Sequence, residues 1–175
     1  MTQEILYTKL HPPALPRWWI AREGPAKRLE EGKQGPLTLV SAPAGYGKST
    51  CVAAWLEARD EPNAWLSLER GDSEPEAFVT YLLAALRTMF QDACPETKML
   101  LEAPEQPPVS VLARNLANEL SAIETPFTLA LDDYHNIGVK SQSTWKLDGW
   151  EIGLMGYIGN NKFSPYLTAA VAALG

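Results

Sequence analysis

The sequence predicts an α/β fold built around a parallel sheet, and three observations support this prediction. Short apolar runs suited to buried strands alternate along the chain with longer segments whose apolar residues recur at helical spacing. A glycine-containing loop joins one of these strands directly to a helix, and a later strand ends in two adjacent carboxylates. No repeat of roughly 20–50 residues is present, which excludes solenoids and propellers.

The composition is that of one domain with an acidic surface. The chain has 175 residues, 46% of them apolar, and a net charge of −6. Because there is no chain-wide positive field to attract phosphates, we expect no direct contact with nucleic acid. The apolar runs are much shorter than the roughly 18 residues of a membrane span, and residues 1–13 contain no signal-peptide core. These features predict a cytoplasmic protein that does not enter a membrane.

The two cysteines, Cys51 and Cys94, have no neighbouring His or Cys at metal-ligand spacing. We expect both to be buried, reduced thiols.

The first helix and strand are expected before residue 41. Pro25 suits a first helical position, and Gly32 and Gly35 end the helix that begins there. Residues 37–40 form a short apolar run typical of a fully buried strand. Residues 49–59 then predict a helix with one apolar face, formed by Val52, Trp55 and Leu56.

A second strand is expected at residues 63–68, followed by a longer helix. Asp72 or Ser73 is a candidate cap for this helix, and Glu76 would complete a capping box with Ser73. The helix should reach about residue 90. Its apolar stripe is interpreted as core packing and contains Phe78, Leu82, Ala85, Leu86 and Met89.

Proline-rich residues 95–108 predict a loop. Ser110 is expected to cap a helix that runs to about Ile123. The buried face of this helix should contain Leu112, Leu116, Leu120 and Ile123. Residues 127–131 then predict a third strand, which leads into Asp132 and Asp133.

The glycine-containing loop lies between the strand at residues 37–40 and the following helix, which is the setting that a P-loop requires. A triphosphate must be held by several backbone N–H groups at once, and Gly45 and Gly47 allow a loop tight enough to present them. Lys48 would reach the β and γ phosphates, and the Ser49 hydroxyl would hold Mg²⁺. The strict motif begins with Gly, whereas this loop has Ala42. The residues expected to bind the nucleotide are Ala44, Gly45, Tyr46, Gly47, Lys48, Ser49 and Thr50.

The two carboxylates after the third strand predict the acidic part of the same site. Asp132, at the strand end, is the expected Mg²⁺ ligand together with Ser49. Asp133 would polarise the attacking water, so Asp133 and Lys48 are the candidate catalytic residues. A solvated strand end is the alternative interpretation of this acidic pair.

Other residues near these motifs have open interpretations. Arg22 belongs to a basic cluster that could simply be solvated, but it could also meet the nucleotide. His135 could donate a hydrogen bond near the phosphates or be structural. Trp18 and Trp19 could cover the adenine or pack beneath the sheet, and packing is the preferred interpretation.

Several separated segments, in the right order, resemble a known family. The sequence resembles the N-terminal ATPase domain of the MalT-like, LuxR-type transcriptional regulators, which are signal-transduction ATPases of the STAND class. The resemblance covers about residues 5–135. The segments that carry it are residues 7–13 (YTKLHPP), 37–50 (LTLVSAPAGYGKST), 64–68 (AWLSL), 71–75 (GDSEP), 81–86 (YLLAAL), 118–120 (NEL) and 131–135 (LDDYH).

The resemblance implies a P-loop NTPase three-layer sandwich that binds ATP and Mg²⁺ and acts as a switch with slow hydrolysis. It implies that Lys48 is the Walker-A lysine, Asp132 the Walker-B aspartate and Asp133 its catalytic neighbour, with Ser49 where the family more often has Thr. In full-length members a C-terminal helix-turn-helix binds promoter DNA, and self-association belongs to that form.

The last forty residues differ in character from the rest. Residues 136–175 hold six of the twelve glycines and one of the fourteen prolines. We therefore expect a partial ATPase domain at 1–135 and an unrelated glycine-rich tail at 136–175. The family resemblance also implies that the strand between the P-loop strand and the Walker-B strand is missing, which leaves the sheet incomplete after the Walker-B strand unless the tail supplies a substitute.

Within the tail, Asp148-Gly149 predicts the turn of a hairpin at residues 145–152, and Ser164-Pro165 predicts a helix that ends at about residue 174. Gly153, Gly156 and Gly159 do not form a dinucleotide fingerprint and are interpreted as flexible backbone.

Two other functions stay open. One is a small P-loop kinase or phosphotransferase, although no Arg follows Asp133 to serve a lid. The other is a chain that binds no nucleotide and acts at most as an interaction fragment.

Overall fold

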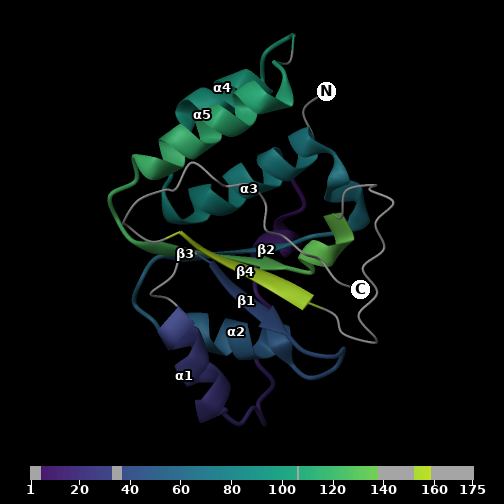
Figure 1. Cartoon of the computed structure of the whole chain (residues 1–175), viewed down its shortest axis with the longest axis vertical. Helices are drawn as coiled ribbons and strands as arrows, with labels where there is room; N and C mark the ends of the chain where they lie inside the picture. The colour runs from purple at the N-terminus through teal and green to yellow at the C-terminus, as the bar shows by residue number, and fades with distance from the viewer. Residues whose placement is uncertain (1–4, 33–36, 106, 138–151, 159–175) are drawn as a thin grey trace.

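The computed structural model has three layers, with a sheet between two groups of helices (Figure 1). It describes residues 5–32, 37–105, 107–137 and 152–158, the last of these as backbone only. Helices α1 (Glu23–Gly32) and α2 (Lys48–Glu57) cover one face of the sheet. Helix α3 (Pro75–Met89) covers the other face, and α4 (Pro95–Leu101) and α5 (Val109–Ser121) lie beyond it. The protein is therefore a mixed α/β fold.

The sheet contains four strands in the order β1-β4-β3-β2. Their bounds are Leu37–Ser41 for β1, Asn63–Ser67 for β2, Phe127–Asp132 for β3 and Ile152–Ile158 for β4. Strands β2 and β3 are parallel, while β4 is antiparallel to both β1 and β3. Strands β1, β2 and β3 therefore run in one direction, as the sequence predicts, and β4 runs against them.

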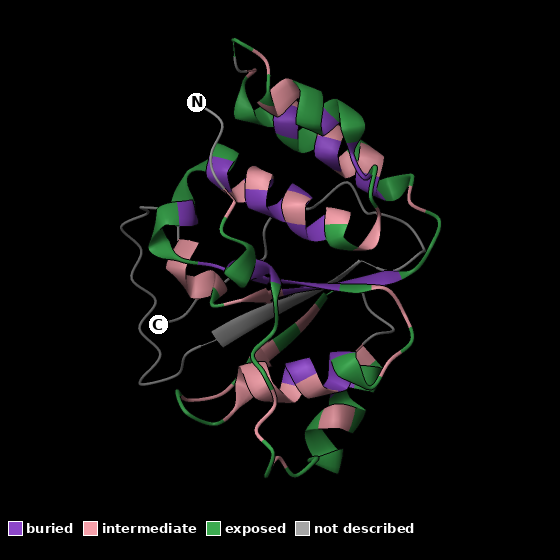
Figure 2. Cartoon of the chain, turned by 180° about the vertical axis from the view of Figure 1, so that it is seen from behind, coloured by how far each residue is buried: buried purple, intermediate pink, exposed green. Residues whose placement is uncertain are grey.

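Strands β2 and β3 are buried on both faces, because their side chains alternate between two apolar clusters. Leu66 and Leu129 belong to the cluster under α3 and α5, whereas Trp65 and Ala130 pack with α1 and α2. Figure 2 shows these central strands as buried and the outer sides of the helices as exposed. Two-sided burial explains why both strands are continuous apolar runs.

Strand β1 departs from the prediction of a fully buried strand. Leu37 and Leu39 are 41% and 45% exposed, whereas Val40 packs against the α1 and α2 cluster. The strand lies at an edge of the sheet in the order given, and α1 and α2 cover only one of its faces. A short apolar run does not by itself distinguish one-sided from two-sided burial.

The predicted helices that fall within the described residues are present, and the predicted apolar faces of α2, α3 and α5 are largely inside. The buried residues of these faces are Val52, Trp55 and Leu56 on α2, Leu82, Ala85 and Leu86 on α3, and Leu112, Leu116 and Leu120 on α5. The 3.6-residue period therefore identified the correct faces.

The predicted capping box at the start of α3 is wrong. The helix begins at Pro75 with Glu74 as its cap residue, and no side chain caps it. Asp72 and Ser73 lie in a separate 3₁₀ helix, Arg70–Ser73, where the Asp72 carboxylate accepts a hydrogen bond from the Glu69 N–H at 2.8 Å. The Asp72 side chain is directed inward, where it pairs with Lys9. The spacing of residues near Asp72 did not reveal this distant partner.

The predicted loop at 95–108 is also wrong in its first half, where α4 forms. Pro95 occupies the first turn, in which a missing N–H has no cost. The Glu119 carboxylate of α5 accepts hydrogen bonds from the backbone N–H groups of Glu96 and Thr97, at 2.8 and 2.9 Å. A side chain 22 residues away from Thr97 thus caps α4. Helix α5 itself begins at Val109, one residue before the predicted Ser110 cap, and no side chain caps it.

Both cysteines are free, Cys94 buried and Cys51 half-buried. Burial raises the pKa of Cys94 to about 11, with the nearby Glu119 carboxylate adding to the effect. The thiol form is therefore favoured at neutral pH. Among the described residues, no helix is both long and apolar enough to span a bilayer.

The tail supplies the strand that the family resemblance implies is missing. Strand β4 lies between β1 and β3 (Figure 1). Gly153 and Gly156 are part of this strand, so their interpretation as flexible backbone is wrong. The predicted helix at 164–174 lies outside the described residues, as does the predicted hairpin at 145–152 except for Ile152.

A buried ion cluster fixes the N-terminal segment. The Lys9 ammonium donates to both carboxylate oxygens of Asp72, at 2.9 and 2.8 Å, lies 3.3 Å from the Glu69 carboxylate and stands 4.6 Å from the centre of the Tyr81 ring. Burial alone lowers the pKa of Lys9, but the bonds to Asp72 and Glu69 outweigh it, so the net pKa is raised. The cluster joins the segment before α1 to the turn before α3.

Replacing Asp72 with Ala should destabilise the fold by about 3 kcal/mol, because it leaves a buried ammonium with its main partner removed. Urea unfolding measures this effect. The matched control is Lys98→Ala, which breaks the exposed Lys98–Glu102 pair and should change stability by less than about 0.5 kcal/mol. Equal effects of the two substitutions would contradict a structural role for the buried cluster.

Candidate functional site

The loop from Ser41 to Lys48, here called the glycine loop, connects β1 to α2. Gly45 and Gly47 adopt left-handed conformations, with φ of 79° and 75°. The Tyr46 N–H donates to the Pro43 carbonyl at 3.3 Å, which closes the turn. Helix α2 starts at Lys48, so the N–H groups of its first turn have no acceptor within the helix. The positive end of the helix dipole and these donors lie at the end of the loop.

Ala42, which stands where the strict motif has Gly, does not adopt a left-handed conformation. The non-glycine residues with positive φ in the described part of the chain are Cys94 and Asp133. The backbone of Ala42 therefore does not require glycine for its φ angle.

The Lys48 side chain bends back over the glycine loop. Its ammonium donates to the Ala42 carbonyl at 2.9 Å and to the Pro43 carbonyl at 3.4 Å. This position places a positive charge directly beside the loop.

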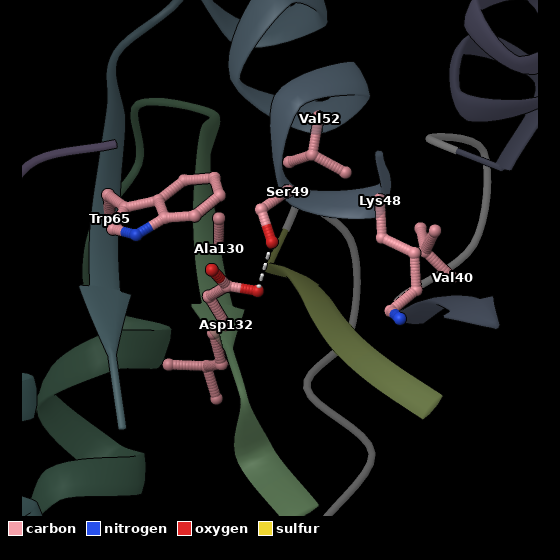
Figure 3. Close-up of a pocket in the computed structure, with 8 residues that line it drawn as sticks. Val40, Lys48, Ser49, Val52, Trp65, Ala130 and Asp132 are labelled. Carbon is pink, nitrogen blue, oxygen red and sulfur yellow. Dashed lines mark hydrogen bonds between the residues drawn. The ribbon is translucent and has the colours of Figure 1, made fainter. Parts of the chain in front are cut away.

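Ser49 and Asp132 meet at the carboxyl-terminal edge of the sheet. The Ser49 hydroxyl, in the first turn of α2, donates to Asp132 Oδ1 at 2.9 Å (Figure 3). Asp132 is the last residue of β3 and β1 leads into the glycine loop, so both strands end at the same edge. The structure therefore brings together residues that are 83 positions apart in the sequence.

The environment of Asp132 opposes its ionisation. Burial is the largest cause of its raised pKa, and the charge of Asp133 adds to the rise. Hydrogen bonds from the Ser49 hydroxyl and the Asp133 N–H, together with the Lys48 charge, lower the pKa without cancelling the effect of burial. A carboxylate in such a position gains from an added positive charge.

Asp133 is exposed and has φ of 55°, the left-handed region that Asp tolerates better than most residues. Its carbonyl accepts the Asn136 N–H at 2.9 Å, which starts the 3₁₀ helix Tyr134–Ile137. The bend turns the chain away immediately after Asp132 and leaves the Asp133 side chain at the surface.

A small hollow lies between Lys48, Ser49 and Asp132 (Figure 3). Its volume is about 230 Å³ when the open solvent at its mouth is included. The remaining residues that line it are Val40, Val52, Trp65, Ala130 and Leu131. The sequence did not mark Trp65 or Ala130 as site residues, since both read as core positions of buried strands. The pairing of β2 with β3 sets Trp65 opposite Ala130, and both line the hollow.

The other predicted site residues do not line this hollow. Ala44 and Tyr46 are exposed on the glycine loop, and Thr50 is half-buried on α2. Arg22 is exposed just before α1. Burial raises the pKa of Cys51, which lies on α2, and the positive charge of Arg22 partly opposes this rise. The Arg22 guanidinium therefore lies within electrostatic reach of α2.

The two tryptophans before α1 differ in exposure. Trp18 is 80% exposed, so the preferred interpretation that it packs beneath the sheet is wrong, whereas Trp19 is half-buried.

The Nδ1 atom of His135 is buried and has no hydrogen-bond partner within the described structure. In the same part of the chain, no group of three or more His, Cys, Asp or Glu side chains is placed to hold a metal.

Replacing Asp132 with Asn should stabilise the ligand-free protein at neutral pH. Because the pKa of Asp132 is higher in the folded than in the unfolded chain, its ionisation opposes folding. This destabilising effect is absent below the pKa that Asp132 has in the unfolded chain, and it is complete above the pKa that Asp132 has in the folded chain. The gain should be absent near about pH 3 and rise to the order of 1 kcal/mol at about pH 7, as urea unfolding at several pH values would measure. The exposed Asp92→Asn is the control, and a gain that shrinks with rising pH would contradict this electrostatic description.

Replacing Gly47 with Ala should destabilise the protein by roughly 1–2 kcal/mol, because an L side chain is disfavoured at φ of 75°. A clash is not the cause, since a Cβ there would meet nothing within 4 Å. Gly71→Ala is the matched control, with the same open surroundings and no positive φ. Thermal unfolding that gave both variants the same midpoint would contradict the left-handed conformation.

Comparison with known proteins identifies related regulators. No family model matches the chain. The HTH-type transcriptional regulator MalT of Cronobacter sakazakii is 32% identical over 133 residues, that of Serratia proteamaculans 35% over 133, and that of Yersinia pestis 34% over 134. Each match covers 76% of this chain but only 15% of the relative, so the chain spans about 15% of the length of these curated relatives. Over 76% of its own length, this chain is therefore a distant homologue of the MalT transcriptional regulators.

Proposed function

We propose that this chain binds ATP·Mg²⁺ at the edge of the sheet where the glycine loop, α2 and β3 meet. The observation that carries the proposal is the Ser49–Asp132 contact beside the glycine loop. Around this contact lie a hydroxyl, a carboxylate, the Lys48 ammonium and the N-terminus of α2. They are at the ends of parallel strands, which is where α/β folds bind ligands.

The phosphates would lie along the glycine loop. Backbone N–H groups of the loop and of the first turn of α2 would donate to their oxygens. Lys48, now bonded to the Ala42 and Pro43 carbonyls, would exchange those neutral acceptors for the charged β and γ phosphates. The exchange favours binding because a charged acceptor forms the stronger hydrogen bond.

Magnesium fits the pair formed by Ser49 and Asp132. Both supply oxygen, the donor that Mg²⁺ prefers, and they are already adjacent at 2.9 Å. One carboxylate and one hydroxyl suffice for this ion, because Mg²⁺ sites are usually completed by phosphate oxygens and water. The ion would also supply a positive charge that favours the ionised form of the half-buried Asp132 carboxyl group.

Asp133 is the proposed catalytic neighbour. It is exposed, directly follows Asp132 in the chain and has a left-handed backbone conformation. From there it would orient an attacking water, which supports slow ATP hydrolysis at most.

The base and sugar would lie outside the hollow. The residues that line the hollow include Lys48, Ser49 and Asp132, which are the residues proposed for the phosphates and the metal. Arg22 and the exposed Tyr46 are the proposed contacts for the rest of the nucleotide.

In cellular terms, we propose that residues 1–135 are part of a P-loop NTPase domain of a cytoplasmic, MalT-like signal-transduction ATPase of the LuxR type, and that residues 136–175 have a different origin. Homology to the MalT regulators supports this role. Transcriptional control, promoter DNA binding and self-association would belong to the parts of such regulators that this chain does not match. A kinase or phosphotransferase is less well supported, since no Arg follows Asp133.

The test is calorimetric titration of the full chain with ATP in the presence of Mg²⁺. Lys48→Ala should weaken binding at least tenfold, because it removes the phosphate-binding charge while the loop keeps its glycines. The control is Lys27→Ala, an exposed lysine on α1, which should bind as the wild type does. Equal affinity of the Lys48→Ala variant and the wild type would refute the site, and absence of binding by all three proteins would refute the function.

A further inference from the structure

Strand β4 occupies an unusual place, because it is paired along both of its edges by strands that flank the candidate site. Its register with β1 runs from Leu37 opposite Gly156 to Ser41 opposite Ile152. Its register with β3 runs from Phe127 opposite Ile158 to Ala130 opposite Met155. The segment from the glycine-rich tail is therefore an interior strand and not an appendage (Figure 1).

Without β4 the sheet would be two separate pieces. In the part of the chain that the structure describes, β1 pairs with β4 alone, while β3 pairs with β2 and β4. One piece would hold β1 with α1 and α2, and the other would hold β2 and β3 with α3 and α5. Among the described residues, links across the gap include the packing of Trp65 and Ala130 against α1 and α2 and the Ser49–Asp132 hydrogen bond.

The two halves of the candidate site belong to these different pieces. The glycine loop follows β1, and Asp132 ends β3. With one strand between them, the backbones of β1 and β3 are held about 10 Å apart, which is twice the spacing of neighbouring strands. The width of β4 thus sets the separation that Lys48, Ser49 and Asp132 must bridge.

The two glycines of β4 weaken it as a strand. Gly153 and Gly156 are two of its seven residues, and glycine weakens the interior of a strand. In compensation, its insertion pairs the inner edges of both β1 and β3, which would otherwise leave backbone groups unpaired. Its docking is therefore open to influence from a ligand.

We propose that residues 152–158 act as a docking strand whose insertion between β1 and β3 is coupled to nucleotide binding. The inference rests on the proposed ATP·Mg²⁺ site. A ligand that bridges the glycine loop and Asp132 binds best when β4 holds both in place, so the bound ligand favours insertion. By reciprocity, insertion raises the affinity for the ligand to the same degree.

Hydrogen exchange on the full wild-type chain tests the coupling directly. ATP·Mg²⁺ should slow the exchange of amides in residues 153–157 and of the β1 amides that face β4. Amides in α3 and α5, which are remote from the site, are the internal reference. Binding of ATP·Mg²⁺, measured by calorimetry, with unchanged exchange in β4 and β1 would overturn the coupling while leaving the nucleotide site intact.

A substitution in β4 tests whether the docked strand is needed for nucleotide binding. Met155 is opposite both Thr38 and Ala130, and Met155→Pro removes an N–H from the middle of the strand. This variant should lose exchange protection in β1 and bind ATP·Mg²⁺ at least tenfold more weakly. Met155→Val, which keeps the N–H and favours strand structure, is the control and should retain both properties.

The outcomes separate the two proposals. Wild-type affinity in Met155→Pro with β1 still protected would overturn the role of β4. If the wild type binds no ATP·Mg²⁺, the proposed function fails, and loss of β1 protection in Met155→Pro but not in Met155→Val would still support β4 as a docked strand. If Met155→Pro also loses protection in α3 and α5, the ligand effect on wild-type exchange decides the coupling.

Discussion

The rest of the structure depends on one constraint, namely that β1 and β3 end at the same edge of a continuous sheet. Both strands pair antiparallel with β4, so they run in the same direction. Helix α2 then begins beside the end of β3, and Ser49 reaches Asp132. The helices on both faces protect this arrangement from water, because β2 and β3 send their side chains alternately into two apolar clusters.

Two carboxylates in this fold are withdrawn from water, with opposite consequences. Asp72 accepts two hydrogen bonds from the buried Lys9 ammonium, so its charge is compensated and ties the N-terminal segment to the domain. Asp132 accepts hydrogen bonds from the Ser49 hydroxyl and the Asp133 N–H, and burial still raises its pKa. Asp72 is therefore paired with a cation within the fold, whereas the charge of Asp132 opposes folding; a carboxylate in such a position gains from an added positive charge, as the proposed site requires.

Local patterns predicted the elements well where local physics decides them. The apolar faces of α2, α3 and α5 follow from residue spacing alone, and the strand before the glycine loop follows from a short apolar run. Two failures occur where a distant side chain intervenes. Glu119 caps α4 inside a predicted loop, and Lys9 draws Asp72 away from the start of α3. No window of neighbouring residues contains either partner.

The sequence by itself determined the chemistry of the candidate site, because Gly45, Gly47, Lys48 and Ser49 are contiguous and Asp132 follows an unmistakable buried strand. Only the tertiary structure decided whether these groups meet. Their meeting depends on pairing between segments far apart in the chain, including a strand from the glycine-rich tail whose own pattern predicted flexible backbone. Side-chain identity is a local property of the chain, whereas strand order is set by the burial of both sheet faces and the pairing of every inner edge.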